Sequence, residues 1–545
     1  MLAVVLLACS CQKNDMADFD DNSYANAKNE LVSSDTLYSM EELQSIFAQR
    51  NYTIDWNKER DPKLIYSIIM HTDSSVNIGY KPIGVGNVSP IVHQINIESS
   101  EWKSVENRLR DTIVRHEKQL LPAAIRKPSS RLPIIAAKIR HYSTLKTISQ
   151  MPEVLFLEVT DDFFSLRPYI PEVGTVRQYI PDPFGKIGCT CDTPAPYNED
   201  DVYVELPGVV RPWNYEYHNI NDDTWAISSG QGVGVAVIDS GLSFAQENLD
   251  GDADFNSGWS SGRSQSSVSF LPFKLSMVSL PYMLLSGWIE QHDASATAND
   301  QCGHGTRMAG LIGAPRGMDL NAVGVAYNCN LDSYRTVHNS IINTTGEKNA
   351  VTEAIVTAGI DPTIQVVSMS IGQIPGASSP SIGLALDFAY NNGKMLVCAA
   401  GTAPDINSVF DPVFPANHSK TIAVTGIKEP ASYPNALVND DAPCKDCFYD
   451  EEVDFAVIME RSGEGNQSRN TLAVTCDGDI PSYSSGTSCA TATLAGMAAL
   501  VWSHLGTSAT REDVLQKLQE SASNPLGDHL KFGYGWVDMA KALEE

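Results

Sequence analysis

The chain has 545 residues, which is enough for two or three domains and a large hydrophobic core. Its 38 basic and 66 acidic residues give a formal net charge of −28, which excludes a function built on binding nucleic acid phosphates.

Residues 1–30 predict export and attachment to a membrane. Leu2–Ala8 is a short apolar run, and the Leu-Leu-Ala-Cys sequence that ends at Cys9 matches the bacterial lipobox, in which the cysteine is lipidated. Ser10–Glu30 then forms a polar, acidic tether. We therefore expect an exported protein of the cell envelope, held at a membrane or cell surface through a lipid on Cys9. A plain signal peptide is the alternative, and Cys11 is a second candidate for the lipid.

Residues 60–165 predict a small α+β domain with the order β-α-β-α-β. Apolar, β-branched runs indicate its strands, and apolar residues at helical spacing indicate its helices. The expected elements are a strand over Lys63–Met70, a helix over Glu101–Leu121, a strand over Leu132–Ile139, a helix over Ser143–Gln150 and a strand over Pro152–Val159.

Residues 166–224 follow as an irregular linker. They contain many prolines, a Cys-Thr-Cys sequence at 189–191 and an acidic cluster at 199–201. Prolines and clustered charges disfavour regular, buried structure, so we expect this segment to connect two domains without belonging to either.

Asp239 ends a predicted buried strand. Residues 233–238 read Val-Gly-Val-Ala-Val-Ile, which is typical of a strand buried on both faces of a parallel sheet. Open α/β sheets place their chemistry at the carboxyl ends of such strands, and Ser240 and Gly241 let the chain turn there. Asp239 is therefore a candidate functional acid; the alternative is that it only bonds the backbone of the turn.

A long segment separates this strand from the next candidate residue. It has a Ser- and Gly-rich part over Gly258–Ser269 and an apolar part over Phe270–Trp288. Lys274, two prolines and several serines interrupt the apolar part, so it does not predict a membrane span. We expect either a flap beside the functional cleft or a hairpin packed into the core.

His304 lies between two glycines at the start of a predicted helix. Gly303 and Gly305 remove side chains from around the imidazole and leave room for a substrate backbone. Residues 308–314 are small and apolar, which favours a helix packed tightly against a sheet. His304 is thus a candidate base, and a histidine satisfied within the core is the alternative.

Ser488 begins an apolar helix. It follows the Ser-Ser-Gly-Thr sequence of 484–487 and precedes 489–502, which are almost all small or apolar. Its hydroxyl would therefore lie at a helix N-terminus, where the helix dipole and free N–H groups favour a developing negative charge. An ordinary capping serine is the alternative for Ser488 taken alone.

Together, Asp239, His304 and Ser488 supply the three groups of a serine protease in the order Asp…His…Ser. The segments around them resemble the subtilase family, the subtilisin-like serine proteases, and the resemblance runs from about Trp225 to about Leu543. It includes further segments in the family's order, namely Ala322–Ala326, Val366–Gly372, Phe414–Ala416 and Ile422–Gly426.

The resemblance implies a fold and a role for each residue. The fold is α/β, with a parallel-sheet catalytic domain over residues 225–545. Asp239 would be the orienting acid, His304 the general base and Ser488 the nucleophile. Ser370, Ile371 and Gly372 would pair with the backbone of a polypeptide substrate.

One position departs from the family pattern. The family's Ala-Ala-Gly-Asn sequence ends in an asparagine whose amide donates to the oxyanion, whereas residues 399–402 here read Ala-Ala-Gly-Thr. Losing such an amide donor costs ~2.7–4 kcal/mol of transition-state stabilisation. We therefore expect Thr402 to give a slower protease, or Asn407 to supply a substitute donor. The alternative is a catalytically weakened fold that binds peptides or protein partners.

The domain over residues 60–165 resembles the inhibitory propeptide of subtilases, above all where its second helix leads into Met151–Val154. Such a domain lowers the folding barrier of a slow parallel-sheet protein and caps the cleft until it is cleaved off. An unrelated α+β domain is the alternative. The family resemblance also allows calcium, but the sequence identifies no site for it or for another metal, and no cofactor is expected.

The remaining cysteines give weaker indications. The Cys-Lys-Asp-Cys sequence at 444–447 lacks the second half of a zinc site, so we expect a disulfide or free thiols there. Cys302 and Cys489 stand next to candidate catalytic residues and would be sensitive to thiol reagents if they were exposed.

Overall fold

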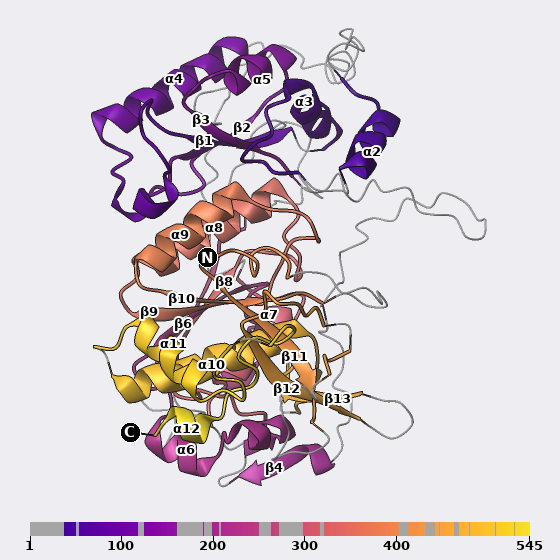
Figure 1. Ribbon diagram of the computed structural model, residues 1–545, viewed down its shortest axis with the longest axis vertical. Coiled ribbons are helices and arrows are strands. Elements are labelled where there is room, and N and C mark those ends of the chain that lie inside the picture. The colour runs from indigo at the N-terminus through magenta and orange to yellow at the C-terminus, as the bar shows by residue number, and fades with distance from the viewer. Residues whose placement is uncertain are drawn as a thin grey trace, which may run out of the picture.

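The computed structural model describes most of the chain from residue 37 to residue 544 (Figure 1). The described residues are 37–50, 54–72, 74–117, 125–160, 189, 199–205, 209–249, 263–271, 298–316, 321–402, 412–430, 442–445, 447–462, 468–478, 480–506, 508–527 and 529–544. They form a small N-terminal domain and a larger α/β domain that begins at residue 199. The expected lipidation sites Cys9 and Cys11 lie outside the described residues.

The N-terminal domain is a three-stranded antiparallel sheet with the strand order β2-β1-β3. Its elements are α2 (Met40–Gln49), α3 (Pro62–His71), β1 (Ser75–Tyr80), η1 (Ser89–Gln94), α4 (Ser100–His116), β2 (Ile134–Lys138), α5 (Tyr142–Ser149) and β3 (Val154–Glu158). In Figure 1, α4 and α5 cover the outer side of the sheet, and the other side faces the larger domain. Both expected helices and the last two expected strands are therefore present.

The first expected strand of this domain is wrong. Residues 63–70 belong to the helix α3, and the strand β1 follows it. Asp61 caps the helix by accepting from the N–H of Lys63 at 2.9 Å, and Pro62 occupies its first turn. Helix α3 packs between α2 and α5 and is buried on nearly all sides, so its apolar residues form no single stripe. The Asp-Pro start was the available signal for a helix.

The larger domain is built on a sheet that has nine strands in the described part of the chain, in the order β14-β13-β12-β11-β10-β9-β6-β8-β7. The strands β6, β7, β8, β9, β10, β11 and β12 pair in parallel, whereas β13 pairs antiparallel with β12 and β14 pairs antiparallel with β13. They are β6 (Gly234–Asp239), β7 (Gln265–Ser269), β8 (Asn330–Arg335), β9 (Ile364–Met369), β10 (Met395–Ala399), β11 (Ile422–Lys428), β12 (Phe455–Ser462), β13 (Ser468–Ala473) and β14 (Ser482–Ser484).

Helices cover both faces of this sheet (Figure 1). They are α7 (His304–Gly313), α8 (Thr345–Ile360), α9 (Pro380–Asn391), α10 (Thr487–Leu505), α11 (Arg511–Glu520) and the short α12 (Met539–Ala542). Because side chains alternate along a strand, Val235 and Val237 of β6 join the core with α7 and α10, whereas Ala236 and Ile238 join the core with α8 and α9. The apolar run before Asp239 is thus buried on both faces, as its composition predicted.

The segment between Asp239 and His304 is described only in part. Residues 265–269 form β7, an edge strand that pairs in parallel with β8. The apolar part that we expected as a flap or a hairpin lies outside the described residues beyond Leu271.

Residues 199–205 and 209–227 contain regular structure, unlike the irregular linker expected there. They form η4 (Glu199–Asp201), β4 (Val202–Glu205), β5 (Val209–Pro212), η5 (Trp213–His218) and α6 (Asp222–Ile227). Asp201 is fully buried and accepts from Nε of Arg461 at 2.8 Å and from Nε of Arg469 at 2.6 Å. Trp213 is fully buried as well. The acidic cluster therefore contributes a buried ion pair to the larger domain, which its charge alone did not indicate.

The N-terminal domain rests on α8 and α9, and one hydrophobic cluster continues across this junction (Figure 1). Within the junction, Nζ of Lys348 donates to the carbonyl of Val159 at 2.8 Å and lies 3.6 Å from the carboxylate of Glu158. The side chains of Lys348 and Glu158 are both 0% exposed, so the charges lie in a dry interface. Thr160 donates to the carbonyl of Asn343 at 2.9 Å.

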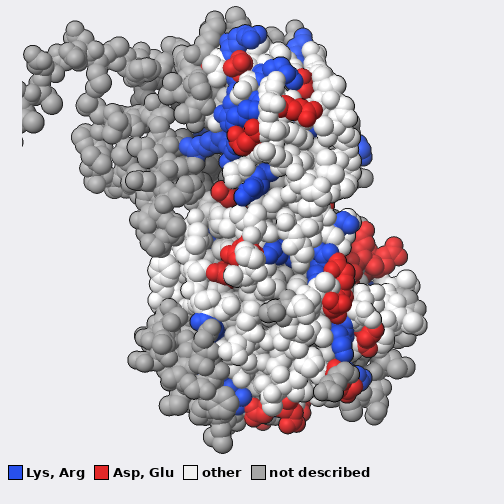
Figure 2. Space-filling model, turned by 90° about the vertical axis from the view of Figure 1, so that its left-hand side faces the viewer, with Lys and Arg blue, Asp and Glu red and all other residues white. Residues whose placement is uncertain are grey.

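Charged residues are unevenly distributed over the surface. In the view of Figure 2, acidic and basic side chains mix over the N-terminal domain, whereas broad areas of the larger domain carry neither. None of the described helices is both long and apolar enough to cross a membrane.

Candidate active site

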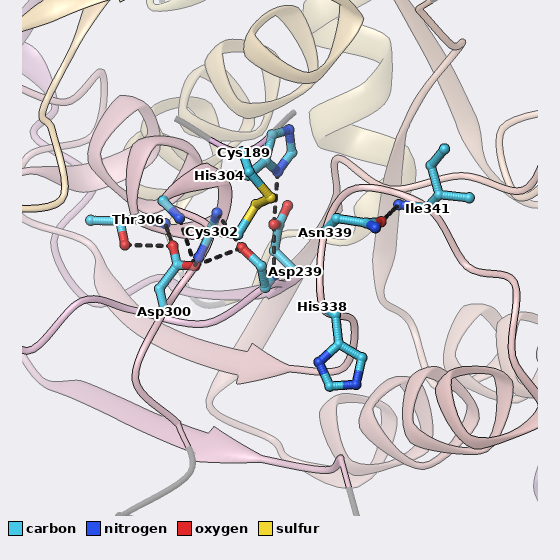
Figure 3. The surroundings of a disulfide bond; sticks show 12 residues. Cys189, Asp239, Asp300, Cys302, His304, Thr306, His338, Asn339 and Ile341 are labelled. Atoms are coloured by element: carbon cyan, nitrogen blue, oxygen red, sulfur yellow. Dashed lines mark hydrogen bonds and ion pairs between the residues drawn. A yellow bond between two sulfur atoms is a disulfide. The ribbon is translucent and has the colours of Figure 1, made fainter. Parts of the chain in front are cut away.

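Asp239 and His304 form a buried pair at the carboxyl edge of the sheet. Asp239 is the last residue of β6, and His304 is the first residue of α7. Nδ1 of His304 lies 2.8 Å from Oδ1 of Asp239 (Figure 3). The two side chains are 8% and 0% exposed. The structure therefore brings together two of the three residues that the sequence singled out.

This pairing sets the protonation of the imidazole. Burial by itself lowers the pKa of His304, but the charge of Asp239, the hydrogen bond to it and the charge of Asp300 raise it, so that the pKa lies above its ordinary value. Because Nδ1 bonds a carboxylate, we assign the proton of the neutral ring to Nδ1, which leaves Nε2 as the basic nitrogen.

Ser488 lies in the first turn of α10, as predicted. Its hydroxyl donates to the carbonyl of Ser370 at 3.1 Å, and the hydroxyl of Ser370 donates to the carbonyl of Ser488 at 2.9 Å. These reciprocal bonds tie the end of β9 to the start of α10. In the described residues, the Ser488 hydroxyl thus bonds Ser370 rather than His304, and catalytic hydrogen bonds often form only when substrate is present.

Thr402 lies beside the start of α10. Its Oγ1 accepts from the N–H of Thr487 at 3.0 Å and lies 3.1 Å from Oγ1 of Thr487. Oγ1 of Thr487 in turn accepts from the N–H of Gly401 at 3.0 Å. The threonine at the unusual position is therefore next to the residue that precedes Ser488. Asn407, the other candidate donor, lies outside the described residues.

The segment Ser370–Gly372 follows β9, and its backbone is already hydrogen-bonded at both Ser370 and Gly372. The N–H of Gly372 donates to the carbonyl of Ser340 at 3.1 Å, and the carbonyl of Gly372 accepts from the N–H of Ile342 at 2.9 Å. Gly372 and Ile341 form a parallel bridge. The backbone groups of Gly372 that we expected to bind a substrate therefore bind the chain's own loop.

The cysteines near the site are not the reactive thiols that we considered. Cys302 forms a disulfide with Cys189, which lies far upstream in the expected linker (Figure 3). Cys489 is free but fully buried, and burial raises its pKa to about 11, so it is a poor target for thiol reagents. Cys444 and Cys447 form a disulfide, one of the two states expected for them. The described residues contain no group of three or more side chains suited to hold a metal ion.

Asp300 is a residue of the site that no sequence pattern above singled out. This carboxylate is 3% exposed and accepts hydrogen bonds from backbone and side-chain groups at the start of α7 and in the turn after β6 (Figure 3). A signal was available, because an acidic residue shortly before a helix whose capping position is glycine is a candidate for the cap.

The chain is similar to known proteins. A family model with the description subtilase family matches residues 230–537. The chain is 26% identical over 321 residues to thermitase of Thermoactinomyces vulgaris, covering 59% of this chain and 91% of thermitase. It is 27% identical over 270 residues to a thermostable alkaline protease of Halalkalibacterium halodurans, covering 49% of this chain and 65% of that protein. Fervidolysin from Fervidobacterium pennivorans, a keratinolytic enzyme related to subtilisin, has a similar fold, with a TM-score of 0.54 and 15% identity over 87% of this chain and 61% of that chain.

Proposed function

Because the chain belongs to the subtilase family and is a serine endopeptidase, we propose that Asp239, His304 and Ser488 are its catalytic triad. The buried contact of 2.8 Å between His304 and Asp239 carries this proposal, since it joins an acid and a base from two elements that the sequence separates widely. Its α/β fold with a parallel sheet is the one that the sequence predicted.

Each residue of the proposed triad has one role. Nε2 of His304 takes the proton of Ser488, whose oxygen attacks the scissile carbonyl, and the imidazolium then returns a proton to the leaving amine. Asp239 holds Nδ1 and stabilises the imidazolium. The hydroxyl of Ser488 now donates to the carbonyl of Ser370, a group that a substrate N–H would also use. Binding of a substrate backbone there would release the Ser488 hydroxyl toward His304.

Thr402 is the proposed side-chain donor to the oxyanion. Because Oγ1 of Thr487 accepts from Gly401, its own proton is available to donate to Oγ1 of Thr402. Thr402 then accepts from the hydroxyl and the N–H of Thr487, which leaves the proton of Thr402 itself free to donate. The backbone N–H of Ser488 is the second donor.

A polypeptide substrate would extend along Ser370–Gly372 as an added strand. The N–H of Gly372 donates to Ser340 and its carbonyl accepts from Ile342, so pairing at that residue requires the Ser340–Ile342 loop to move aside. Short substrates that reach only to Ser370 would not need this movement.

The N-terminal domain is proposed as the enzyme's own inhibitory prodomain, over residues 60–165. Support comes from its β-α-β-α-β core, from its position directly ahead of the protease in the chain, and from its docking on α8 and α9. Self-cleavage would then release it, and the protein would be made as a zymogen.

Export and lipid anchoring are proposed from the sequence around Cys9. Replacing Cys9 by serine should move the protein from the membrane fraction to a soluble exported fraction, which fractionation and immunoblotting would measure. Membrane association that survives both Cys9→Ser and Cys11→Ser would contradict the anchor.

Reaction with a fluorophosphonate probe tests the triad. The processed protein should be labelled once, on Ser488, and should hydrolyse peptides. Ser488→Ala should abolish both properties and leave the N-terminal domain uncleaved. Ser370→Ala removes a hydroxyl next to Ser488 but keeps the nucleophile, so this variant should still be labelled. A wild-type protein that is folded but neither labelled nor active would favour a peptide-binding subtilase without catalysis.

A further inference from the structure

The start of α7 lacks the usual capping side chain. Its N-cap residue is Gly303, which has a φ of +85° and therefore adopts a conformation that favours glycine. The first N–H groups of a helix have no partner inside the helix and need an acceptor from elsewhere. At α7 this need coincides with the position of His304, because the histidine is the first residue of the helix.

Asp300 supplies these acceptors from outside the helix. Its Oδ1 accepts from the N–H of Cys302 at 2.9 Å and from the N–H of Gly303 at 2.8 Å. Its Oδ2 accepts from the N–H of Thr306 at 2.9 Å and from the hydroxyl of Thr306 at 2.7 Å. The chain is thus fixed on both sides of His304 by one carboxylate. A negative charge at this end of a helix is also favoured by the helix dipole.

The same carboxylate reaches the turn that carries Asp239. The hydroxyl of Ser240 donates to Oδ1 of Asp300 at 3.0 Å and accepts from the N–H of Gly305 at 2.9 Å. The hydroxyl of Thr306, which donates to Asp300, accepts from the N–H of Ser243 at 2.9 Å. Asp300 therefore joins the residues next to Asp239 and the residues next to His304 in one network (Figure 3).

Helix α7 and the turn after β6 approach each other very closely. A Cβ atom on Gly305 would lie 2.3 Å from the carbonyl oxygen of Gly241 and 3.2 Å from Cβ of Asp239. Small residues permit this approach, but they do not enforce it. The hydrogen bonds to Asp300 supply the directional contacts that do.

We infer that Asp300 is a positioning residue that holds His304 and Asp239 in their productive contact. Its hydrogen bonds in the described residues go to Ser240, Thr306 and the backbone around His304, and it acts through these groups. The inference rests on the proposed function of the triad, and it assigns a role to a carboxylate that the catalytic steps do not use.

The variants Asp300→Ala and Asp300→Asn test this role. Misplacing a catalytic group by about 1 Å costs about 10²-fold in rate, so Asp300→Ala should lower kcat by about that factor with little change in KM. Asp300→Asn keeps one acceptor oxygen and should lose about tenfold. Turnover is expressed per active site, titrated with the fluorophosphonate, so that misfolded protein does not count.

The pH profile is the readout that a purely structural role would not change. The charged groups that act on His304 are Asp239 of β6, Asp300 and, from α7 itself, Arg307, which opposes the two carboxylates. Removing the charge of Asp300 lowers the pKa of His304, so the acidic limb of kcat/KM should move to lower pH in both variants. Asp454→Asn is the control: Asp454 is a half-buried carboxylate, which accepts from the N–H of Ala423 at 2.8 Å just before β12, at the opposite edge of the parallel sheet.

Histidine NMR of the Ser488→Ala protein separates this inference from the proposed function. The proton between His304 and Asp239 should give a strongly deshielded signal that is lost or shifted when Asp300 is replaced as well. An Asp300→Ala enzyme with normal turnover per titrated site and an unmoved acidic limb, but a lower melting temperature, would overturn the inference. A wild-type protein without hydrolytic activity would overturn the proposed function alone, because the NMR signal would still report on the pair.

Discussion

Thr402 shows at the scale of single residues how neighbouring groups determine what a side chain can donate. Its hydroxyl accepts from the N–H of Thr487 and lies 3.1 Å from the hydroxyl of Thr487. In the proposed arrangement Thr487 donates in that second contact, and the proton of Thr402 is then available to a substrate. An asparagine at this position could fill both roles, accepting from Thr487 through its oxygen and donating through its amide. The threonine gives a shorter donor for the same task.

Changes at Thr402 should therefore act on turnover. Thr402→Val keeps the shape but removes the donor, and should lower kcat at least tenfold with little effect on KM, because the interaction forms mainly in the transition state. Thr402→Asn should raise kcat, and a gain of about 1.4 kcal/mol would appear as tenfold. Steady-state kinetics on a peptide substrate measures both. Equal turnover in all three proteins would show that another group stabilises the oxyanion.

His304 predicts the direction of the pH dependence. The base must be neutral to take the proton of Ser488, and the charge of Asp239 holds the pKa of His304 above its ordinary value despite burial. The acidic limb of kcat/KM in the free enzyme should therefore have its midpoint above about 6.5, with activity lost as the pH falls through it. A midpoint well below that value would mean that Asp239 does not hold the ring in solution.

At the scale of elements, α8 contributes one half of a buried ion pair to the junction between the two domains. Lys348 in its first turn meets Glu158, the last residue of β3, where neither side chain reaches water. A buried ion pair is weak evidence for net stability, but removing one partner leaves the other charged and unpaired, at a cost of about 3–5 kcal/mol. Replacing either residue of the pair alone should therefore weaken the docking of the N-terminal domain.

Substitutions in this pair should change how long the N-terminal domain stays bound after cleavage. Glu158→Gln should shorten the lag before activity appears, and adding Lys348→Met should restore much of it, since no unpaired charge then remains. Lys58→Met is the control, because Lys58 pairs with Asp55 at the surface and such pairs contribute about 1 kcal/mol or less. If the double variant has the same short lag as Glu158→Gln, charge pairing is not what holds the junction.

At the scale of the whole molecule, a disulfide connects the segment before the protease to the active-site loop. Cys189 and Cys302 are 113 residues apart in sequence, and Cys302 stands two residues before His304. Closing so long a loop restricts the unfolded chain strongly. By the chain-entropy relation it stabilises the protein by about 5 kcal/mol, against about 1–2 kcal/mol for a bridge over three residues such as Cys444–Cys447.

Removing the two bridges should therefore have unequal effects. The Cys189→Ser/Cys302→Ser protein should melt at a clearly lower temperature than the Cys444→Ser/Cys447→Ser protein, as calorimetry without reductant would show. Its turnover should fall as well, because the loop that carries Asp300 and leads to His304 loses a covalent attachment. Similar melting temperatures for the two double variants would contradict a dominant role for loop length.

The sequence by itself predicted the features that depend on neighbouring residues. The apolar run before Asp239, the glycines around His304 and the small residues after Ser488 set local backbone and burial, so the parallel sheet and both helices could be inferred from them. Only the tertiary structure decided the contacts between distant residues: Cys189 with Cys302, Lys348 with Glu158, Asp201 with Arg461 and Asp300 with Ser240. The helix α3 lies between these cases: its apolar residues are buried by partners on several sides, which hides the helical period, and only the Asp61-Pro62 start marks it locally. Local propensity is written in adjacent residues, whereas these pairs depend on how separate elements pack, and no short pattern in the chain encodes that.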